Sequence, residues 1–240
     1  MTEELASRDA YLRECPALVT AVIPDGVVLD RTVFYPRGGG QPGDTGFLEW
    51  AGGRCAVTDT VRDQGEVLHV TAPEMAPPAG TTVRAVIDWE RRHLLMRTHT
   101  ALHVLSALVW REYGAKVTGG NMEPGQARMD FELEAMSVEF GREVEERLNS
   151  MLSTSHPVEV QFLPRARALA DPDLIRTKVS LIPEHVDPIR VVDIAGLDRQ
   201  ADGGTHVADT AEVGRVRVVK TESKGKGNKR MRIELDSSPA

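Results

Sequence analysis

An abrupt change of pattern near residue 88 constrains the fold more than any other feature of this sequence. From Trp89 to Tyr113 there is no glycine or proline, and apolar residues such as Leu95 and Leu102 recur at helical spacing. Asp88 suits the N-cap of such a helix, and Gly114 suits its end. The spacing therefore predicts one long helix that begins directly after Asp88.

The residues before this helix are typical of β structure. Short β-prone runs are separated by proline, glycine and aspartate, at residues 18–23, 27–29, 32–35, 54–60, 67–70 and 82–87. Several strands at short spacing indicate a small barrel or sandwich. We predict an α+β protein, with a small N-terminal β-barrel over residues 1–88 and an α+β domain over residues 89–240. The second domain is expected to contain a helix at about 137–152 and strands at 191–194, 213–219 and 230–235.

Composition excludes several classes of protein. With 41% hydrophobic and 27% charged residues, the chain is neither collagenous nor wholly disordered. No run approaches roughly 18 apolar residues, and the N-terminus lacks the pattern of a secretory signal, so we expect no membrane partner. Two cysteines cannot form a disulfide framework. A cytoplasmic location is the resulting expectation.

Charge is distributed unevenly along the chain. Residues 1–88 carry 7 basic and 13 acidic side chains, whereas residues 215–235 carry 8 basic and 2 acidic ones. An acidic protein with such a basic stretch can dock a phosphate backbone locally. An edge hairpin protected by lysines would explain the same charges.

Three histidines and one aspartate form the first candidate site. His99 and His103 lie four residues apart on the predicted helix, so both project from one face and can share a metal ion. Thr100 stands where the zincin motif H-E-x-x-H has its glutamate, which argues against a metalloprotease. After a Gly-Gly turn comes His206, four residues beyond Asp202. Three histidines plus Asp202 or a water would complete a four-coordinate zinc site, and ordinary capped and buried histidines are the alternative.

A run of three glycines, Gly38, Gly39 and Gly40, followed by Gln41, forms the second candidate site. Successive glycines let the backbone approach a ligand closely and offer amide donors. The segment is neither a Walker A motif nor a dinucleotide fingerprint. Taken alone, it is better explained as a flexible hairpin connection between two strands.

Three segments, taken in their order along the chain, closely resemble the motifs of one protein family. They are FYPRGGGQPGDTG at 34–46, DWERRHLLMRTHTALHVLSALV at 88–109 and DGGTHVADTAEVG at 202–214. The sequence resembles the alanyl-tRNA trans-editing proteins of the AlaX type, in their medium-length form. These are freestanding relatives of the editing domain of alanyl-tRNA synthetase. The likeness continues through residues 117–133 and the basic tail at 220–235.

The resemblance implies an ATP-independent hydrolase. It would cleave the ester that joins a mischarged amino acid, chiefly serine and sometimes glycine, to alanine tRNA. The family's zinc motif, H-x-x-x-H followed by C-x-x-x-H, matches His99, His103 and His206 and implies one zinc ion per chain. Asp202 stands in place of the cysteine, and a carboxylate is a harder and weaker donor than a thiolate. Three interpretations of Asp202 stay open: it is the fourth ligand, which we favour; it lies beside a three-histidine site and acts as a general base; or it marks a site that has lost its metal.

The resemblance also suggests roles for the other candidates. Gln41, which we take with Asp202 as a catalytic candidate, and the glycines 38–40 match a motif that helps to shape the editing pocket. Thr118 falls near a threonine that contacts the serine hydroxyl. Candidate phosphate contacts are basic residues of the long helix and the C-terminal stretch: Arg91, Arg92, Arg97, Lys224, Lys226, Lys229 and Arg230. Local ion pairs are the alternative role of the three arginines.

The expected partner is tRNA(Ala) mischarged with serine or glycine, bound by a monomer or a weak homodimer. Two other functions remain open at this point. One is a noncatalytic tRNA-binding module that has lost the metal because Asp202 replaces the cysteine. The other is a zinc-dependent hydrolase of small esters or amides with no role on RNA.

Overall fold

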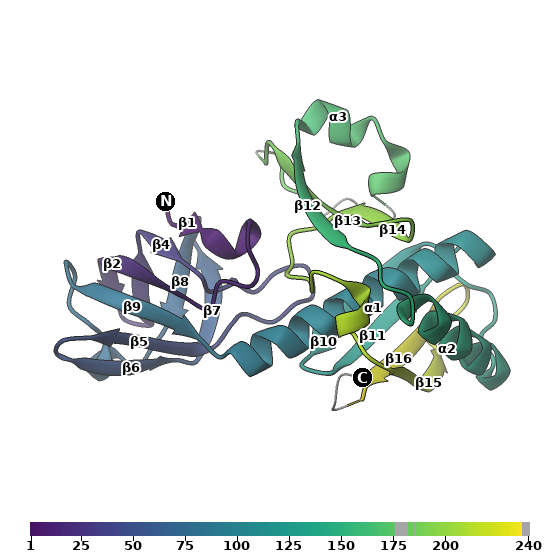
Figure 1. Cartoon of the computed structure of the whole chain (residues 1–240), viewed down its shortest axis with the longest axis horizontal. Helices are drawn as coiled ribbons and strands as arrows, with labels where there is room; N and C mark the ends of the chain where they lie inside the picture. Colours follow the sequence, from purple (N-terminus) through teal and green to yellow (C-terminus); the bar gives the residue numbers. More distant parts are fainter. Residues whose placement is uncertain (176–181, 185, 237–240) are drawn as a thin grey trace. The chain divides into compact units, whose positions relative to one another are not determined.

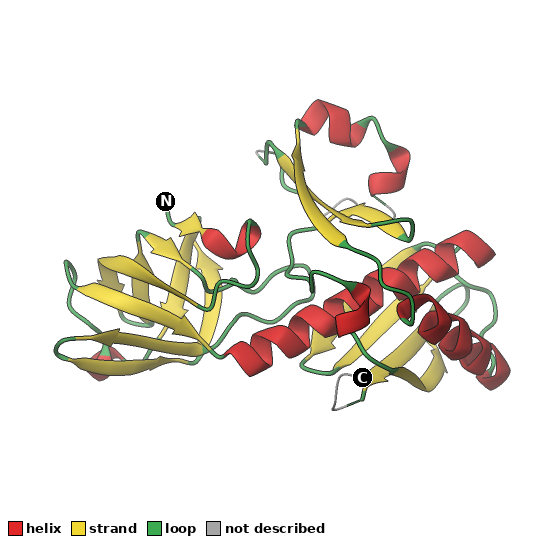
Figure 2. Ribbon diagram, in the orientation of Figure 1, coloured by secondary structure: helices red, strands yellow, loops and turns green. Residues whose placement is uncertain are grey.

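The computed structural model describes residues 1–175, 182–184 and 186–236 of the chain. Strands and helices are mixed, and the chain divides into two compact units, Met1–Leu94 and Leu95–Ala240 (Figures 1 and 2). The long helix α1 (Trp89–Tyr113) starts in the first unit and continues in the second. Among the described residues, no helix is long and apolar enough to cross a membrane.

The first unit is built on an antiparallel sheet of seven strands, in the order β6-β5-β9-β2-β3-β8-β7. The strands of this sheet are β2 (Glu14–Ile23), β3 (Gly26–Leu29), β5 (Gly46–Trp50), β6 (Gly53–Val57), β7 (Asp59–Asp63), β8 (Glu66–Val70) and β9 (Thr82–Ile87). A short parallel pair and two 3-10 helices complete the unit: β1 (Glu3–Glu4), β4 (Arg31–Thr32), η1 (Leu5–Ser7) and η2 (Pro73–Met75).

The core of the first unit follows from alternation along the strands. In β2, the side chains of Cys15, Ala17 and Val19 are buried, whereas their neighbours along the strand are exposed. These residues pack with Phe34 and Leu48 in one apolar cluster. At β2 the sheet therefore has one face on the core and one in solvent.

The predicted closed barrel is not found among the described residues, because the two edge strands β6 and β7 do not pair. The sheet turns at β2, which pairs with β9 through residues 14–18 and with β3 through residues 19–23. Only Thr58 separates β6 from β7, so the run at 54–60 is two strands rather than one. β6 and β7 follow each other along the chain, but they form the two opposite edges of the sheet. No pairing between them is found in the described part of the chain, so the sheet is not closed into a barrel.

The second unit contains two antiparallel sheets. The four-stranded sheet has the order β10-β11-β16-β15, and α2 packs on β15. The three-stranded sheet has the order β12-β13-β14. The bounds are β10 (Val117–Glu123), β11 (Gln126–Phe131), α2 (Val138–Leu152), β12 (Val158–Leu163), α3 (Arg165–Leu169), η3 (Pro172–Leu174), β13 (Ile189–Ile194), β14 (Asp198–Ala201), η4 (Thr210–Glu212), β15 (Val216–Ser223) and β16 (Lys229–Leu235).

The start and end predicted for the long helix are confirmed by the bounds of α1. The Asp88 carboxylate accepts the Arg91 N–H at 3.1 Å, and Gly114, at a φ of +62°, donates its N–H to the Trp110 carbonyl. Every residue from 95 to 109 is buried. A helix that is enclosed on all sides needs a hydrogen-bond partner for each polar side chain. The histidines on α1 are therefore held in defined positions.

Candidate metal centre

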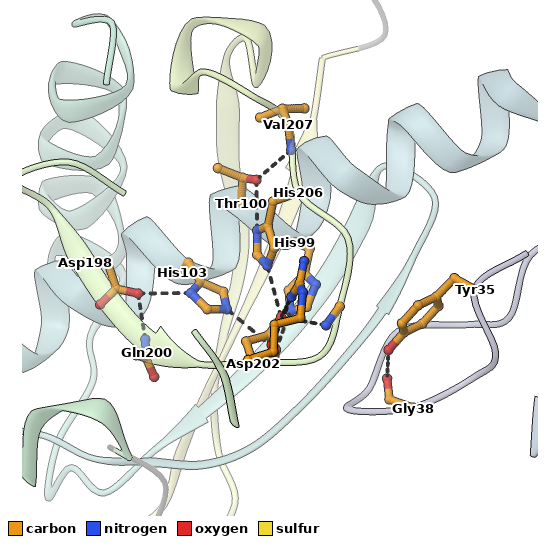
Figure 3. Close-up of polar contacts among 12 residues, drawn as sticks. Tyr35, Gly38, His99, Thr100, His103, Asp198, Gln200, Asp202, His206 and Val207 are labelled. Carbon is orange, nitrogen blue, oxygen red and sulfur yellow. Dashed lines mark hydrogen bonds and ion pairs between the residues drawn. The ribbon is translucent and has the colours of Figure 1, made fainter. Parts of the chain in front are cut away.

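Four side chains converge on α1 in the second unit: His99, His103, Asp202 and His206 (Figure 3). One nitrogen or oxygen atom from each lies within 4.8 Å of the others. The three histidines are buried, at 4–8% exposed, and the Asp202 side chain is 15% exposed. The structure thus brings together the four residues that the sequence singled out as metal donors.

The loop after β14 owes its shape to Asp202. The Asp202 carboxylate accepts the backbone N–H of Gly204 at 2.7 Å, which closes a tight turn. On the other side, the backbone N–H of Asp202 donates to the Arg190 carbonyl, and Arg190 Nη1 donates to the Asp202 carbonyl at 2.9 Å. This turn brings His206 to the same side as Asp202, facing α1.

Each histidine directs its Nε2 atom towards Asp202. The distance is 3.1 Å from His206 to Oδ2, 3.6 Å from His99 to Oδ1 and 3.9 Å from His103 to Oδ1. The ring centroids of the three imidazoles are 4.4–5.1 Å apart. Three imidazole nitrogens and one carboxylate oxygen therefore face a common centre.

Sequence reasoning missed the side chains behind these donors. Asp198 lies 2.9 Å from His103 Nδ1, and Gln200 donates to Asp198 at 2.7 Å. Thr100 Oγ1 lies 3.1 Å from His206 Nδ1 and accepts the Val207 N–H at 3.3 Å. The sequence offered no local signal for Asp198 and Gln200, because Arg199 between them is polar as well.

Burial sets the protonation of two of the histidines. It lowers the pKa of His99 to about 4 and that of His206 well below its usual range. Burial opposes the charged form of His103 as well, but Asp198 and Asp202 more than offset this and raise the pKa of His103 to about 9. At neutral pH, His99 and His206 are thus in the neutral form that ligates metals.

The carboxylate of Asp202 is ionised. Burial alone would raise the pKa of Asp202, but His99, together with His103 and His206, outweighs burial and holds that pKa well below its usual range. An ionised carboxylate among imidazoles is a donor set that suits a divalent first-row ion such as zinc. Convergence, burial and the protonation of His99, His206 and Asp202 therefore fit a bound metal ion, and His103 would release a proton on binding it.

Thiol reagents are expected to leave this centre intact. The chain's two cysteines, Cys15 and Cys55, are buried in the first unit, and burial raises the pKa of both thiols. None of the four converging donors carries sulfur. We expect the metal content of the folded protein to be the same before and after iodoacetamide treatment.

The variant Asp202→Cys is the matched control for this experiment, because it places a thiol among the three histidines. Its metal-free form should be alkylated and should then fail to take up zinc. Loss of metal from the unsubstituted protein under the same treatment would contradict the proposed donor set.

The glycine motif in the first unit forms a tight hairpin. Gly38 and Gln41 exchange two backbone hydrogen bonds of 2.9 and 3.1 Å, and the two residues between them, Gly39 and Gly40, have φ values of +58° and +85°. The Tyr35 hydroxyl donates to the Gly38 carbonyl at 3.0 Å (Figure 3). Gln41 is buried, with 1% of its surface exposed. The motif is therefore a built turn rather than a flexible connection.

The structure contradicts two of the predicted phosphate contacts, because both arginine side chains are buried. Arg92 and Arg97 are 0% and 4% exposed. The guanidinium of Arg92 donates to Asp44, and that of Arg97 donates to the Val213 carbonyl at 2.9 and 3.0 Å. Since α1 is enclosed along most of its length, these arginines bind within the protein. Arg91 is half-buried and donates to the Gly43 carbonyl at 2.8 Å.

The other candidates lie on the β15–β16 hairpin and beside it. Lys224 and Lys226 are exposed in the connecting turn, whereas Lys229 is buried and donates to the Gly225 carbonyl. Thr118 on β10 donates to the side-chain carbonyl of Asn228 at 2.9 Å. Arg230 forms an ion pair with Asp130, through bonds of 2.7 and 2.8 Å.

Family models match two parts of the chain. A model described as tRNA synthetases class II (A) matches residues 11–91, and one described as Threonyl and Alanyl tRNA synthetase second additional domain matches residues 189–232. The second match contains Asp198, Asp202 and His206, and the first contains the glycine motif.

Whole-chain relatives are similar as well. The chain is 40% identical to the alanyl-tRNA editing protein AlaX-M of Saccharolobus solfataricus, over 96% of this chain and 98% of that protein. It is 38% identical to AlaX-M of Methanosarcina acetivorans, over 98% and 99% of the two chains. It is also 39% identical to the alanine–tRNA ligase of Pyrobaculum aerophilum, over 92% of this chain but 25% of that enzyme.

Proposed function

This chain belongs to the alanyl-tRNA editing proteins of the AlaX-M type, and from that premise we propose that it is a deacylase of mischarged tRNA(Ala). Its substrates would be Ser-tRNA(Ala) and Gly-tRNA(Ala), and the bond cleaved would be the ester between the amino acid and the tRNA. The convergence of three histidines and Asp202 carries the proposal, because it offers a site for metal-assisted hydrolysis. Residues 1–88 would carry the glycine motif, and residues 89–240 the hydrolytic site.

We assign one zinc ion to His99, His103, Asp202 and His206. When bound there, zinc would supply the Lewis acidity that ester hydrolysis uses. Asp202 is better suited to be a ligand than a general base, because its carboxylate faces the Nε2 atoms of all three histidines. Its Oδ1 faces His99 and His103, and its Oδ2 is shared with His206 and the Gly204 amide.

Selection of serine over alanine requires a group that pairs with the substrate hydroxyl. We assign this role to Thr118. The Thr118 hydroxyl already donates to Asn228, so it retains lone pairs that can accept a hydrogen bond from serine. When alanine is bound instead of serine, the polar group that would pair with the serine hydroxyl lacks that hydrogen bond. Such a loss costs about 1–3 kcal/mol, which is the scale that this discrimination needs.

We propose that phosphates near the acceptor end of the tRNA contact Arg91, Lys224 and Lys226. The two lysines are exposed in the turn of a hairpin whose own charges are partly paired, as Arg230 is with Asp130. Lys229 and Arg230 would then support the shape of this hairpin rather than bind phosphate.

The double variant Lys224→Ala/Lys226→Ala is expected to weaken tRNA binding and to make it less sensitive to salt. If each lysine neutralises one phosphate, the slope of log K against log salt falls by about 1.4–1.8, since each contact contributes about 0.7–0.9. Binding of tRNA(Ala) measured at several salt concentrations checks this. The control is Lys220→Ala, because Lys220 is ion-paired with Glu222; an equal loss in this variant would contradict the assignment.

Hydrolysis of Ser-tRNA(Ala) and of Ala-tRNA(Ala) by the purified protein tests the proposed function. We expect the zinc-loaded protein to release serine rapidly and to spare alanine. A protein that binds tRNA(Ala) and leaves both esters intact would be a noncatalytic binding module. Hydrolysis of small esters that added tRNA does not inhibit would instead identify a general esterase.

A further inference from the structure

A buried carboxylate lies directly behind one of the metal donors. The Asp198 side chain is fully enclosed, with 0% of it exposed, and its Oδ2 lies 2.9 Å from His103 Nδ1 (Figure 3). Gln200, two residues further along β14 and on the same face, donates its side-chain N–H to the same oxygen at 2.7 Å. A carboxylate is costly to bury, so one that is kept here needs these partners.

The chemistry of this contact determines which nitrogen of His103 can bind a metal. A neutral imidazole has one N–H, and a carboxylate can only accept. When metal binding removes one proton from His103, the proton that remains therefore resides on Nδ1, and the lone pair is on Nε2, which faces Asp202 Oδ1 at 3.9 Å. The contact of His206 is different, because the Thr100 hydroxyl at its Nδ1 can both donate and accept.

We propose that Asp198 is a positioning residue for the metal centre: it keeps the proton of His103 on Nδ1 and so presents Nε2 to the metal. Gln200 fixes the orientation of the carboxylate. The inference rests on the proposed function only in assuming that the four converging side chains hold a metal ion.

The variant Asp198→Asn tests this proposal. Asparagine has nearly the same shape as aspartate, but its side chain can donate hydrogen bonds as well as accept them. An asparagine can present its NH₂ group to Nδ1, which permits the His103 proton to move to Nε2 and blocks the donor. We expect zinc affinity, measured by competition with a coloured chelator, to fall by about 10–100-fold. The visible spectrum of the Co²⁺-loaded variant should change as well, since one ligand is displaced or reoriented.

Asp193→Asn is the matched control. Asp193 lies on the neighbouring strand β13 and is ion-paired with Arg199 at 3.4 Å, so the variant removes a carboxylate from the same sheet. It should bind zinc as the unsubstituted protein does. An Asp198→Asn protein that is folded and binds zinc with unchanged affinity would overturn the proposal.

If Asp198→Asn does not fold, Gln200→Ala provides the test. It leaves the carboxylate in place and removes the donor Gln200, and a several-fold loss of zinc affinity is expected. Unchanged affinity in this variant would then overturn the proposal. Failure of the proposed function is distinguishable: a zinc-bound protein that does not deacylate Ser-tRNA(Ala) would contradict editing and leave the role of Asp198 standing.

Discussion

Replacing Asp202 by asparagine is expected to lower zinc affinity and the rate of Ser-tRNA(Ala) deacylation by more than about 100-fold. Removing a group that only hydrogen-bonds to a ligand already costs about 10–100-fold in affinity, and Asp202 is proposed to be a ligand itself. The asparagine oxygen can still accept the Gly204 N–H, so the turn should be retained. Metal content and deacylation, measured on the same sample, check this.

Asp202→Cys provides the positive control for this substitution. A thiolate is a softer and stronger donor to zinc than a carboxylate, so this variant should bind zinc at least as tightly as the unsubstituted protein. It should also retain deacylation. An Asp202→Asn protein that keeps both its zinc and its activity would show that Asp202 is not a ligand.

Replacing Asp44 by alanine is expected to destabilise the first unit by about 3–5 kcal/mol, because it leaves the charge of Arg92 buried and unpaired. The two side chains are 1% and 0% exposed. Arg92 Nε lies 2.9 and 3.0 Å from the Asp44 oxygens, and the Arg92 guanidinium also donates to the Ala10 and Val33 carbonyls. Urea unfolding followed by fluorescence, with Trp50 and Trp89 in this unit, measures the loss.

Two control variants show whether the loss of stability comes from leaving the Arg92 charge buried and unpaired or from the loss of an ion pair as such. Glu4→Ala removes a carboxylate from Arg62, but that pair is 26% and 53% exposed, so about 0–1 kcal/mol is expected. The double variant Asp44→Ala/Arg92→Ala removes both charges and should be less destabilised than the sum of the two single variants. Equal losses from Asp44→Ala and Glu4→Ala would contradict the account.

Local signals in the sequence predicted the frame of the site. The gap in glycine and proline, with Asp88 and Gly114 at its ends, predicted α1, and the four-residue spacing put His99 and His103 on one face. Ser137 likewise starts α2, where it accepts the Phe140 N–H. In each case the deciding interactions lie within a few residues along the chain.

Contacts between distant segments were not predictable in the same way. Asp198 meets His103 across 95 residues, and nothing in the local pattern of either segment records that contact. The arginines on α1 look alike in the sequence, yet Arg92 and Arg97 are buried because the rest of the chain encloses the helix. The pairing of β6 and β7 with other strands, rather than with each other, also depends on tertiary structure.

The most direct test of metal-assisted editing is a zinc titration of the metal-stripped protein, with hydrolysis of Ser-tRNA(Ala) as the readout. We expect little hydrolysis without metal and a rise that saturates at about one zinc per chain, since the four donors form one site. Full activity of the metal-free protein, unchanged by added zinc, would contradict this expectation.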